Sequence, residues 1–113
     1  MTTEKFIAFM EKLLEKTKSG KIDWRRYIPG GAEKWVSPTR SFVCTAGTME
    51  VFMLCSEDLE VIHLYIKYDS TFPMAGFSVE GPEAKQVALR LVNYVYSIFP
   101  NLEESIDKFL REP

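Results

Sequence analysis

The single histidine is the first candidate for chemistry. His63 lies within the apolar run at 59–68, two residues before Tyr65. An imidazole changes charge near neutral pH, so with a carboxylate such as Glu50 it could serve as an acid or base in a small-ligand pocket. Such a role needs a nucleophile or water and an orienting group, and the sequence holds no motif that supplies them. A packed structural histidine is favoured, and we predict that the protein is not an enzyme.

A second candidate is the basic and aromatic run at 24–27, WRRY. Residues 21–40 hold five basic residues against two acidic ones. Such side chains can stack on bases and contact phosphate, which makes the loop 24–40 an alternative nucleic-acid site through Arg25, Arg26, Lys34 and Arg40. The net charge of the whole chain is −2, which disfavours this function. The favoured interpretation is that Trp24 anchors the loop in the core, while the arginines stay in water or pair with acids.

The two cysteines, Cys44 and Cys55, complete the set of reactive side chains. Two are too few for a disulfide-rich secreted scaffold, and one histidine does not complete a four-ligand zinc site. Their expected strand positions separate the two Cα atoms by roughly 13 Å, too far for a disulfide. We therefore expect two buried thiols, no metal and no cofactor.

The elements that must position these residues form one α+β domain over residues 1–113. Apolar spacing of three and four residues predicts a helix over 1–20, with Thr3 as its N-cap and Gly20 as its stop. An irregular loop over 21–39 contains both tryptophans. Residues 40–80 are predicted to form a meander of three or four antiparallel strands, and residues 82–111 two helices. All three helices are expected to pack mainly on one face of the sheet.

The expected strand bounds are 40–46, 49–56, 59–68 and 77–80, with two-residue turns at 47–48 and 57–58. Asn101 is expected to cap the last helix. An apolar stripe of this helix, Ile106, Phe109 and Leu110, is predicted to face inward.

Side-chain alternation along these strands predicts two unlike faces. One face is wholly apolar and must be the core. The other is mixed and carries a contiguous apolar and aromatic patch, made of Val43, Phe52, Leu54, Val61, His63 and Tyr65. Exposed patches of this kind mark an interface or a ligand groove. Either the 21–39 loop covers this patch with Trp24 and Trp35, or a second subunit or a partner does; the loop or a homodimer is favoured over a different partner.

The run from Leu13 to Trp24, LLEKTKSGKIDW, resembles small bacterial proteins of mostly unknown function. In these proteins an N-terminal helix ends in a K-T-x-x-G-K-I-x-W-like motif, and a meander of strands, a helix and a short second helix follow. This chain departs from them by an insertion of Pro29-Gly30-Gly31 and a second Trp before the first strand. The resemblance implies a bacterial accessory protein of a mobile element or regulatory system, and it implies no catalytic residues.

The combined prediction is a small cytoplasmic, non-enzymatic interaction or regulatory module that associates with itself or with a protein partner. Its N-terminus has no signal-peptide pattern, and no stretch is long and apolar enough to cross a membrane. The expected interaction face consists of Trp24, Arg25, Arg26, Trp35, Phe52, His63 and Tyr65. A nucleic-acid contact and a small-ligand pocket around His63 remain the alternatives.

Overall fold

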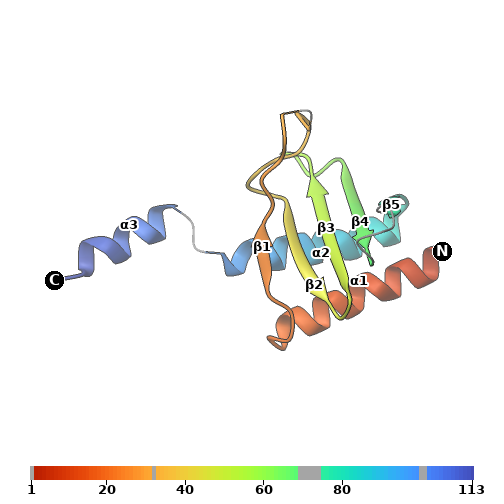
Figure 1. Ribbon diagram of the computed structural model, residues 1–113, viewed down its shortest axis with the longest axis horizontal. Helices are drawn as coiled ribbons and strands as arrows, with labels where there is room; N and C mark the ends of the chain where they lie inside the picture. Colours follow the sequence, from red (N-terminus) through yellow and green to blue (C-terminus); the bar gives the residue numbers. More distant parts are fainter. Residues whose placement is uncertain (1, 32, 69–74, 100–101) are drawn as a thin grey trace.

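A computed structural model describes residues 2–31, 33–68, 75–99 and 102–113 of the chain. The order along the chain is one helix, five strands and two helices (Figure 1). Their bounds are α1 Thr3–Lys18, β1 Trp24–Arg26, β2 Phe42–Ala46, β3 Met49–Cys55, β4 Ile62–Lys67, β5 Ala75–Ser78, α2 Pro82–Ile98 and α3 Leu102–Arg111. The α+β class and the antiparallel meander are confirmed.

The five strands form one antiparallel sheet in the order β1-β2-β3-β4-β5. The prediction of three or four strands is therefore too low. Three residues in the expected irregular loop pair with β2, with Trp24 opposite Cys44, and form β1. The strand predicted over 77–80 lies two residues earlier as β5, and the loop that precedes β5 falls largely outside the described residues.

The turns determine which residues share a face. The turn at 47–48 has the expected two residues, with Gly47 at a φ of 64°. The next turn is longer than predicted, because Cys55 pairs with Ile62 and six residues lie between them. The predicted turn and the observed one differ by an even number of residues, so the alternation is preserved. The predicted apolar face is therefore the observed core face.

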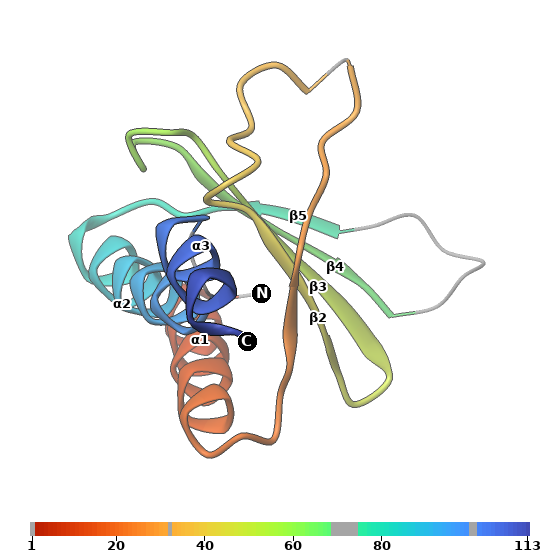
Figure 2. The same ribbon diagram turned by 90° about the vertical axis from the view of Figure 1, so that its left-hand side faces the viewer.

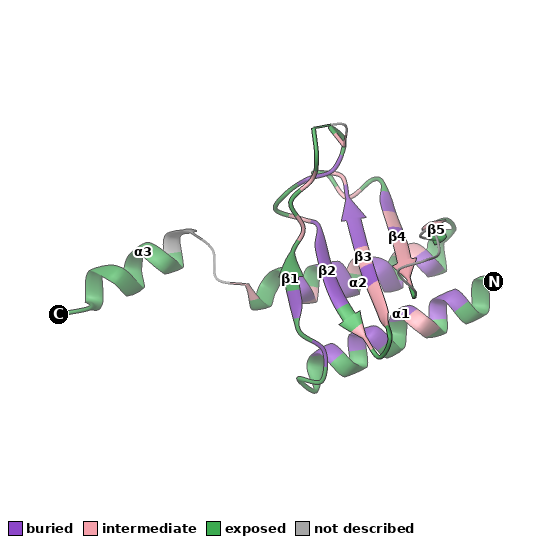
Figure 3. Cartoon of the chain, in the orientation of Figure 1, coloured by how far each residue is buried: buried purple, intermediate pink, exposed green. Residues whose placement is uncertain are grey.

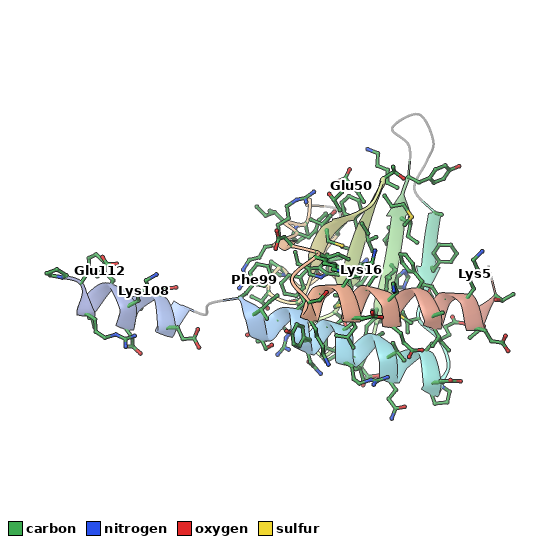
Figure 4. All side chains as sticks on the ribbon, turned by 90° about the horizontal axis from the view of Figure 1, so that it is seen from below. Lys5, Lys16, Glu50, Phe99, Lys108 and Glu112 are labelled. Atoms are coloured by element: carbon green, nitrogen blue, oxygen red, sulfur yellow. The ribbon has the colours of Figure 1, made fainter. Side chains whose placement is uncertain are left out.

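Helices α1 and α2 lie side by side and cover one face of the sheet (Figures 2 and 4). The buried side chains of both helices meet the inward residues of the central strands, which appear as the purple bands in Figure 3. Met10, Phe42, Met53 and Leu91 are fully buried in this layer. Among the residues that the structure describes, no helix lies on the other face of the sheet (Figure 2), so this is the face open to a functional site.

The ends of α1 follow from its flanking residues. Thr2, rather than Thr3, caps the N-terminus, and its hydroxyl accepts a hydrogen bond from the Lys5 amide at 3.2 Å. At the C-terminus the Lys21 amide donates to the Lys16 carbonyl at 2.9 Å, while Gly20 has a φ of 74°. This is the Schellman motif that a glycine after a helix favours. It reverses the chain and directs it into β1.

The third helix is where the structure corrects the predicted packing. Ile106 is 49% exposed and Phe109 and Leu110 are each 73% exposed, so this stripe does not face inward. Figures 1 and 4 show α3, with Lys108 and Glu112, away from the two helices that cover the sheet. Asn101, the expected cap, lies outside the described residues. Of the three helices, two pack on the sheet.

Candidate functional site

The segment between β1 and β2 closes over one end of the open sheet face. The Tyr27 amide donates to the Ser41 carbonyl at 3.1 Å, which extends the β1–β2 pairing. The Ser37 amide donates to the Cys55 carbonyl at 2.8 Å, and the Ser41 hydroxyl accepts from the Cys55 amide at 3.0 Å. Ser37 also donates to the Glu57 carboxylate. These bonds fix both ends of the segment to the sheet.

A pocket of about 250 Å³ lies between this segment and the sheet, and six residues line it: Tyr27, Glu33, Trp35, Phe52, Leu54 and Tyr65. The segment contributes the first three, β3 the next two and β4 the last. Phe52 and Tyr65 are directly paired across β3 and β4. The rings of Tyr27 and Phe52 meet edge to face at 5.9 Å. Four aromatic rings and one carboxylate therefore surround a small space.

The Glu33 carboxylate is held against the Tyr27 ring. The Tyr27 hydroxyl lies 2.8 Å from both carboxylate oxygens of Glu33. The Glu33 amide donates to the Gly30 carbonyl at 3.0 Å, which fixes the turn between the two residues. Burial raises the pKa of Tyr27, and the hydrogen bond to Glu33 and its negative charge raise it further. The carboxylate is thus positioned at the pocket by a neutral phenol.

His63 lies beside the pocket rather than within its lining. Its ring is 5.2 Å from the Trp35 ring and 6.1 Å from the Tyr65 ring, and its Nε2 is 3.2 Å from the Ser78 hydroxyl. The imidazole therefore supports two of the pocket walls. The predicted grouping of His63 and Tyr65 is present, but Glu50 is not part of it, because it pairs with Arg25 at 3.0 Å.

Tyr65 owes its position partly to a glycine on the neighbouring strand. Gly76 pairs with Tyr65, and a Cβ atom on Gly76 would lie 2.7 Å from Cε1 of the tyrosine ring. The ring therefore lies over a place on β5 that only glycine leaves free. This arrangement sets the orientation of one pocket wall.

Together with Arg26, Trp24 is one of the two predicted interaction-face residues that the structure places on the helix side of the sheet. It is 7% exposed and belongs to the core on the helix side of the sheet. Its indole N–H donates to the Thr17 hydroxyl at 2.8 Å, and that hydroxyl donates to the Leu13 carbonyl at 2.6 Å. Alternation along β1 gives the reason, because Trp24 pairs with the core residue Cys44. The favoured interpretation of the basic and aromatic run, in which Trp24 anchors the chain in the core, describes its position.

The basic residues proposed for nucleic acid are divided between the two sides of the sheet. Arg25 lies on the open face and pairs with Glu50, the one ion pair that the structure gives across this face within the described residues. Arg26 lies 5.1 Å from the centroid of the Phe99 ring, and Arg40 lies 4.5 Å from that of Tyr96, both at the end of α2. Lys34 is exposed in the loop. These positions do not form one continuous basic surface.

The cysteines are buried and unbridged, as expected. Burial raises the pKa of both thiols to about 12. Neither thiol is therefore a nucleophile at neutral pH. Among the described residues, no cluster of histidine, cysteine and acidic side chains has the arrangement of a metal site.

Sequence reasoning found Trp35, Phe52 and Tyr65 but missed Tyr27, Glu33 and Leu54 as partners in one pocket. Leu54 is predicted in the apolar and aromatic patch of this face, but not as a wall of a pocket. The signal for the other two is the run Pro29-Gly30-Gly31, which predicts a break in regular structure between Tyr27 and Glu33.

Comparison with known protein families, with curated proteins and with solved structures gave no match to this chain. The resemblance to small bacterial proteins therefore stays a prediction. Within the part of the chain that the structure describes, no helix has both the length and the apolar character to cross a bilayer.

Proposed function

We propose that this protein is a non-enzymatic interaction module that binds a partner protein on the open face of its sheet. The observation that carries the proposal is the pocket that Tyr27, Trp35, Phe52 and Tyr65 surround. A small aromatic pocket on an otherwise open face is the feature that anchor side chains occupy at protein interfaces.

The surroundings of the pocket support a macromolecular partner. Trp35 and Val61 are 41% and 42% exposed, and Ile28, which follows the pocket residue Tyr27, is 87% exposed. Trp35 is itself a wall of the pocket, and exposed apolar surface of this kind is typical of an interface. The pocket itself, at about 250 Å³, is smaller than the roughly 300–1,000 Å³ of a typical small-molecule site. Its size suits one side chain or a small head group rather than a drug-sized ligand.

The chemistry of the lining supports binding rather than turnover. Its ionisable groups are the Glu33 carboxylate and two phenols, and the carboxylate already accepts from Tyr27. The imidazole of His63 is engaged by two rings and the Ser78 hydroxyl. A general base needs a nucleophile within reach, and these six lining residues provide none that is activated.

The test is a capture experiment that compares matched variants. Wild-type protein, Trp35→Ala and Tyr96→Ala are each used as tagged bait in nuclease-treated lysate of the source cells. Trp35 lines the pocket, whereas Tyr96 is a similarly exposed aromatic residue on α2. We expect one partner to be retained in stoichiometric amount by wild type and Tyr96→Ala and lost with Trp35→Ala.

Two outcomes would overturn the proposal. One is a partner that all three baits retain equally, which would place the interface elsewhere. The other is recovery of this chain alone, together with a pocket-dependent change in its own oligomeric state, which would make the face a homodimer interface. Thermal unfolding of each bait shows whether Trp35→Ala remains folded.

A further inference from the structure

The pocket is suited to a positive charge. Its lining combines four aromatic rings with one carboxylate, and none of the six lining residues is basic. The faces of aromatic rings carry partial negative charge and attract a cation within about 6 Å of the ring centre. Glu33 adds a full negative charge. Arg25, which lies on the same sheet face, is paired with Glu50 at 3.0 Å.

The geometry of Glu33 distinguishes between kinds of cation. An arginine guanidinium binds a carboxylate through two parallel hydrogen bonds in the fork between the two oxygens. In this pocket the Tyr27 hydroxyl already occupies that fork, because it lies 2.8 Å from each oxygen. A guanidinium would have to displace it. A cation that needs no hydrogen bonds, and interacts through charge alone, would not.

The small number of acceptors disfavours a second kind of cation. An unmodified lysine ammonium is strongly hydrated and carries three donors that must be satisfied when it leaves water. Phe52, Leu54 and Trp35 offer no side-chain acceptor, and the acceptors of the lining are Glu33, which already accepts from Tyr27, and the two phenol oxygens. An alkylated ammonium is larger, weakly hydrated and free of this requirement, and aromatic cages favour such groups.

The geometry points to an alkylated ammonium head group, carried on a side chain of the partner protein, as the group that the pocket binds. The inference rests on the proposed function for the source of the group. In this assignment the aromatic rings and the Glu33 carboxylate attract the cation, and the Tyr27 hydroxyl discriminates against guanidinium.

The first experiment tests the charge with two small probes. Choline and 3,3-dimethylbutan-1-ol have nearly the same shape, but only choline is charged. Binding of each is titrated by NMR shifts of the wild-type protein. We expect choline to bind at least about fivefold more tightly, as cation–π attraction implies. Equal affinity for the two probes, or no choline binding in the range of about 1–10 mM, would overturn the inference.

The second experiment tests the roles of the lining residues. Glu33→Gln is expected to weaken choline binding by about tenfold, while Glu50→Gln, a carboxylate on the same face outside the pocket, leaves it unchanged. Tyr27→Phe keeps the ring but opens the carboxylate fork, so the affinity for methylguanidinium relative to choline should rise. Equal effects of Glu33→Gln and Glu50→Gln, or an unchanged preference in Tyr27→Phe, would contradict the assignment. Thermal unfolding reports whether each variant is folded.

The third experiment tests the source of the group. A glycine- and serine-flanked peptide with one trimethyllysine should bind at least about fivefold more tightly than choline, because its backbone can add contacts with exposed residues such as Trp35. The same peptide with unmodified lysine should bind more weakly than the trimethylated one. A trimethyllysine peptide no tighter than choline would overturn the protein-borne source in favour of a free small cation.

The two proposals fail in different ways. A partner lost with Trp35→Ala, together with no choline binding, would preserve the interaction module and remove the cation. Selective choline binding, together with a partner that Trp35→Ala retains, would preserve the cation site and remove the proposed interface.

Discussion

The Thr17 hydroxyl forms a hydrogen-bonded link between α1 and β1. Thr17 is 5% exposed, and it accepts from the Trp24 indole N–H while it donates to the Leu13 carbonyl. Thr17→Val keeps the shape but leaves the buried indole N–H without an acceptor, so we expect the free energy of unfolding to fall by about 1–3 kcal/mol. Urea denaturation measures this loss.

Ser97→Ala is the control for this change. Its hydroxyl donates to a carbonyl of the same helix on an exposed surface, and its removal should cost less than about 0.5 kcal/mol. An unchanged urea midpoint for Thr17→Val would mean that the indole N–H finds another acceptor and that this bond does not stabilise the fold.

The thiols make stability depend on alkaline pH. Burial raises the pKa of Cys44 and Cys55 to about 12 from an ordinary value of 9.0. Below about pH 9 the thiol is protonated in both states, and its contribution to stability is fully present. Between about pH 9 and 12 the unfolded thiol ionises while the buried one stays protonated, so this contribution is lost as the pH rises. We expect the free energy of unfolding to fall by the order of 1–2 kcal/mol per thiol by about pH 10.5.

The comparison that isolates this effect uses the double variant Cys44→Ala/Cys55→Ala. Tyrosines and lysines titrate in both proteins, so the difference between their two pH profiles belongs to the thiols. Parallel profiles between pH 8 and 10.5 would show that the thiols ionise as readily in the folded protein as in the unfolded chain.

At the scale of single elements, the sequence predicts which side of the sheet each residue faces better than it predicts where each strand begins and ends. The alternation of apolar residues from Phe42 to Ile66 identifies the core face even though the turn at 56–61 is longer than expected, because an even change preserves alternation. Three residues at Trp24–Arg26 carry too little pattern to predict a strand. Their pairing with β2 is a tertiary event, and it also decides that Trp24 faces the helices.

Strand β5 offers a prediction about the pocket wall. Gly76→Ala would place a Cβ atom 2.7 Å from Cε1 of Tyr65, so the ring must move. The ring is the end of a side chain and can rotate, so we expect a stability loss below about 1 kcal/mol but altered aromatic NMR shifts of Tyr65 and His63. Gly30→Ala, where the added Cβ meets nothing within 4 Å, is the control. Unchanged shifts would show that Tyr65 does not rest on this glycine.

The pocket itself could be predicted only in part. Alternation places Phe52, Leu54 and Tyr65 on one face, and a loop with tryptophan implies cover for it. The approach of Glu33 to Tyr27 depends on the turn that the loop takes between them, and no periodic pattern encodes that turn. Loop conformation is therefore the part of the site that sequence periodicity leaves open.

At the scale of the whole molecule, α3 makes the protein more extended than a compact domain with the same number of residues (Figure 1). The Cα radius of gyration is 15.1 Å and the extents are 53 × 34 × 32 Å. A compact domain of this length would have a radius of gyration of about 13 Å. The periodicity of α3 correctly indicates an amphipathic helix, but periodicity states that a face is apolar and not what that face contacts.

This arrangement predicts that α3 contributes little to folding. A chain that ends at Phe99 should have a free energy of unfolding within about 0.5 kcal/mol of that of the full chain, because Ile106, Phe109 and Leu110 are exposed. Its radius of gyration in X-ray scattering should fall to about 13 Å. Phe99→Ala is the contrasting change, since this ring stacks on the buried Phe42 at 5.0 Å, and we expect a loss of about 1–3 kcal/mol. A shortened chain destabilised by several kcal/mol would mean instead that α3 packs on the body of the protein in solution.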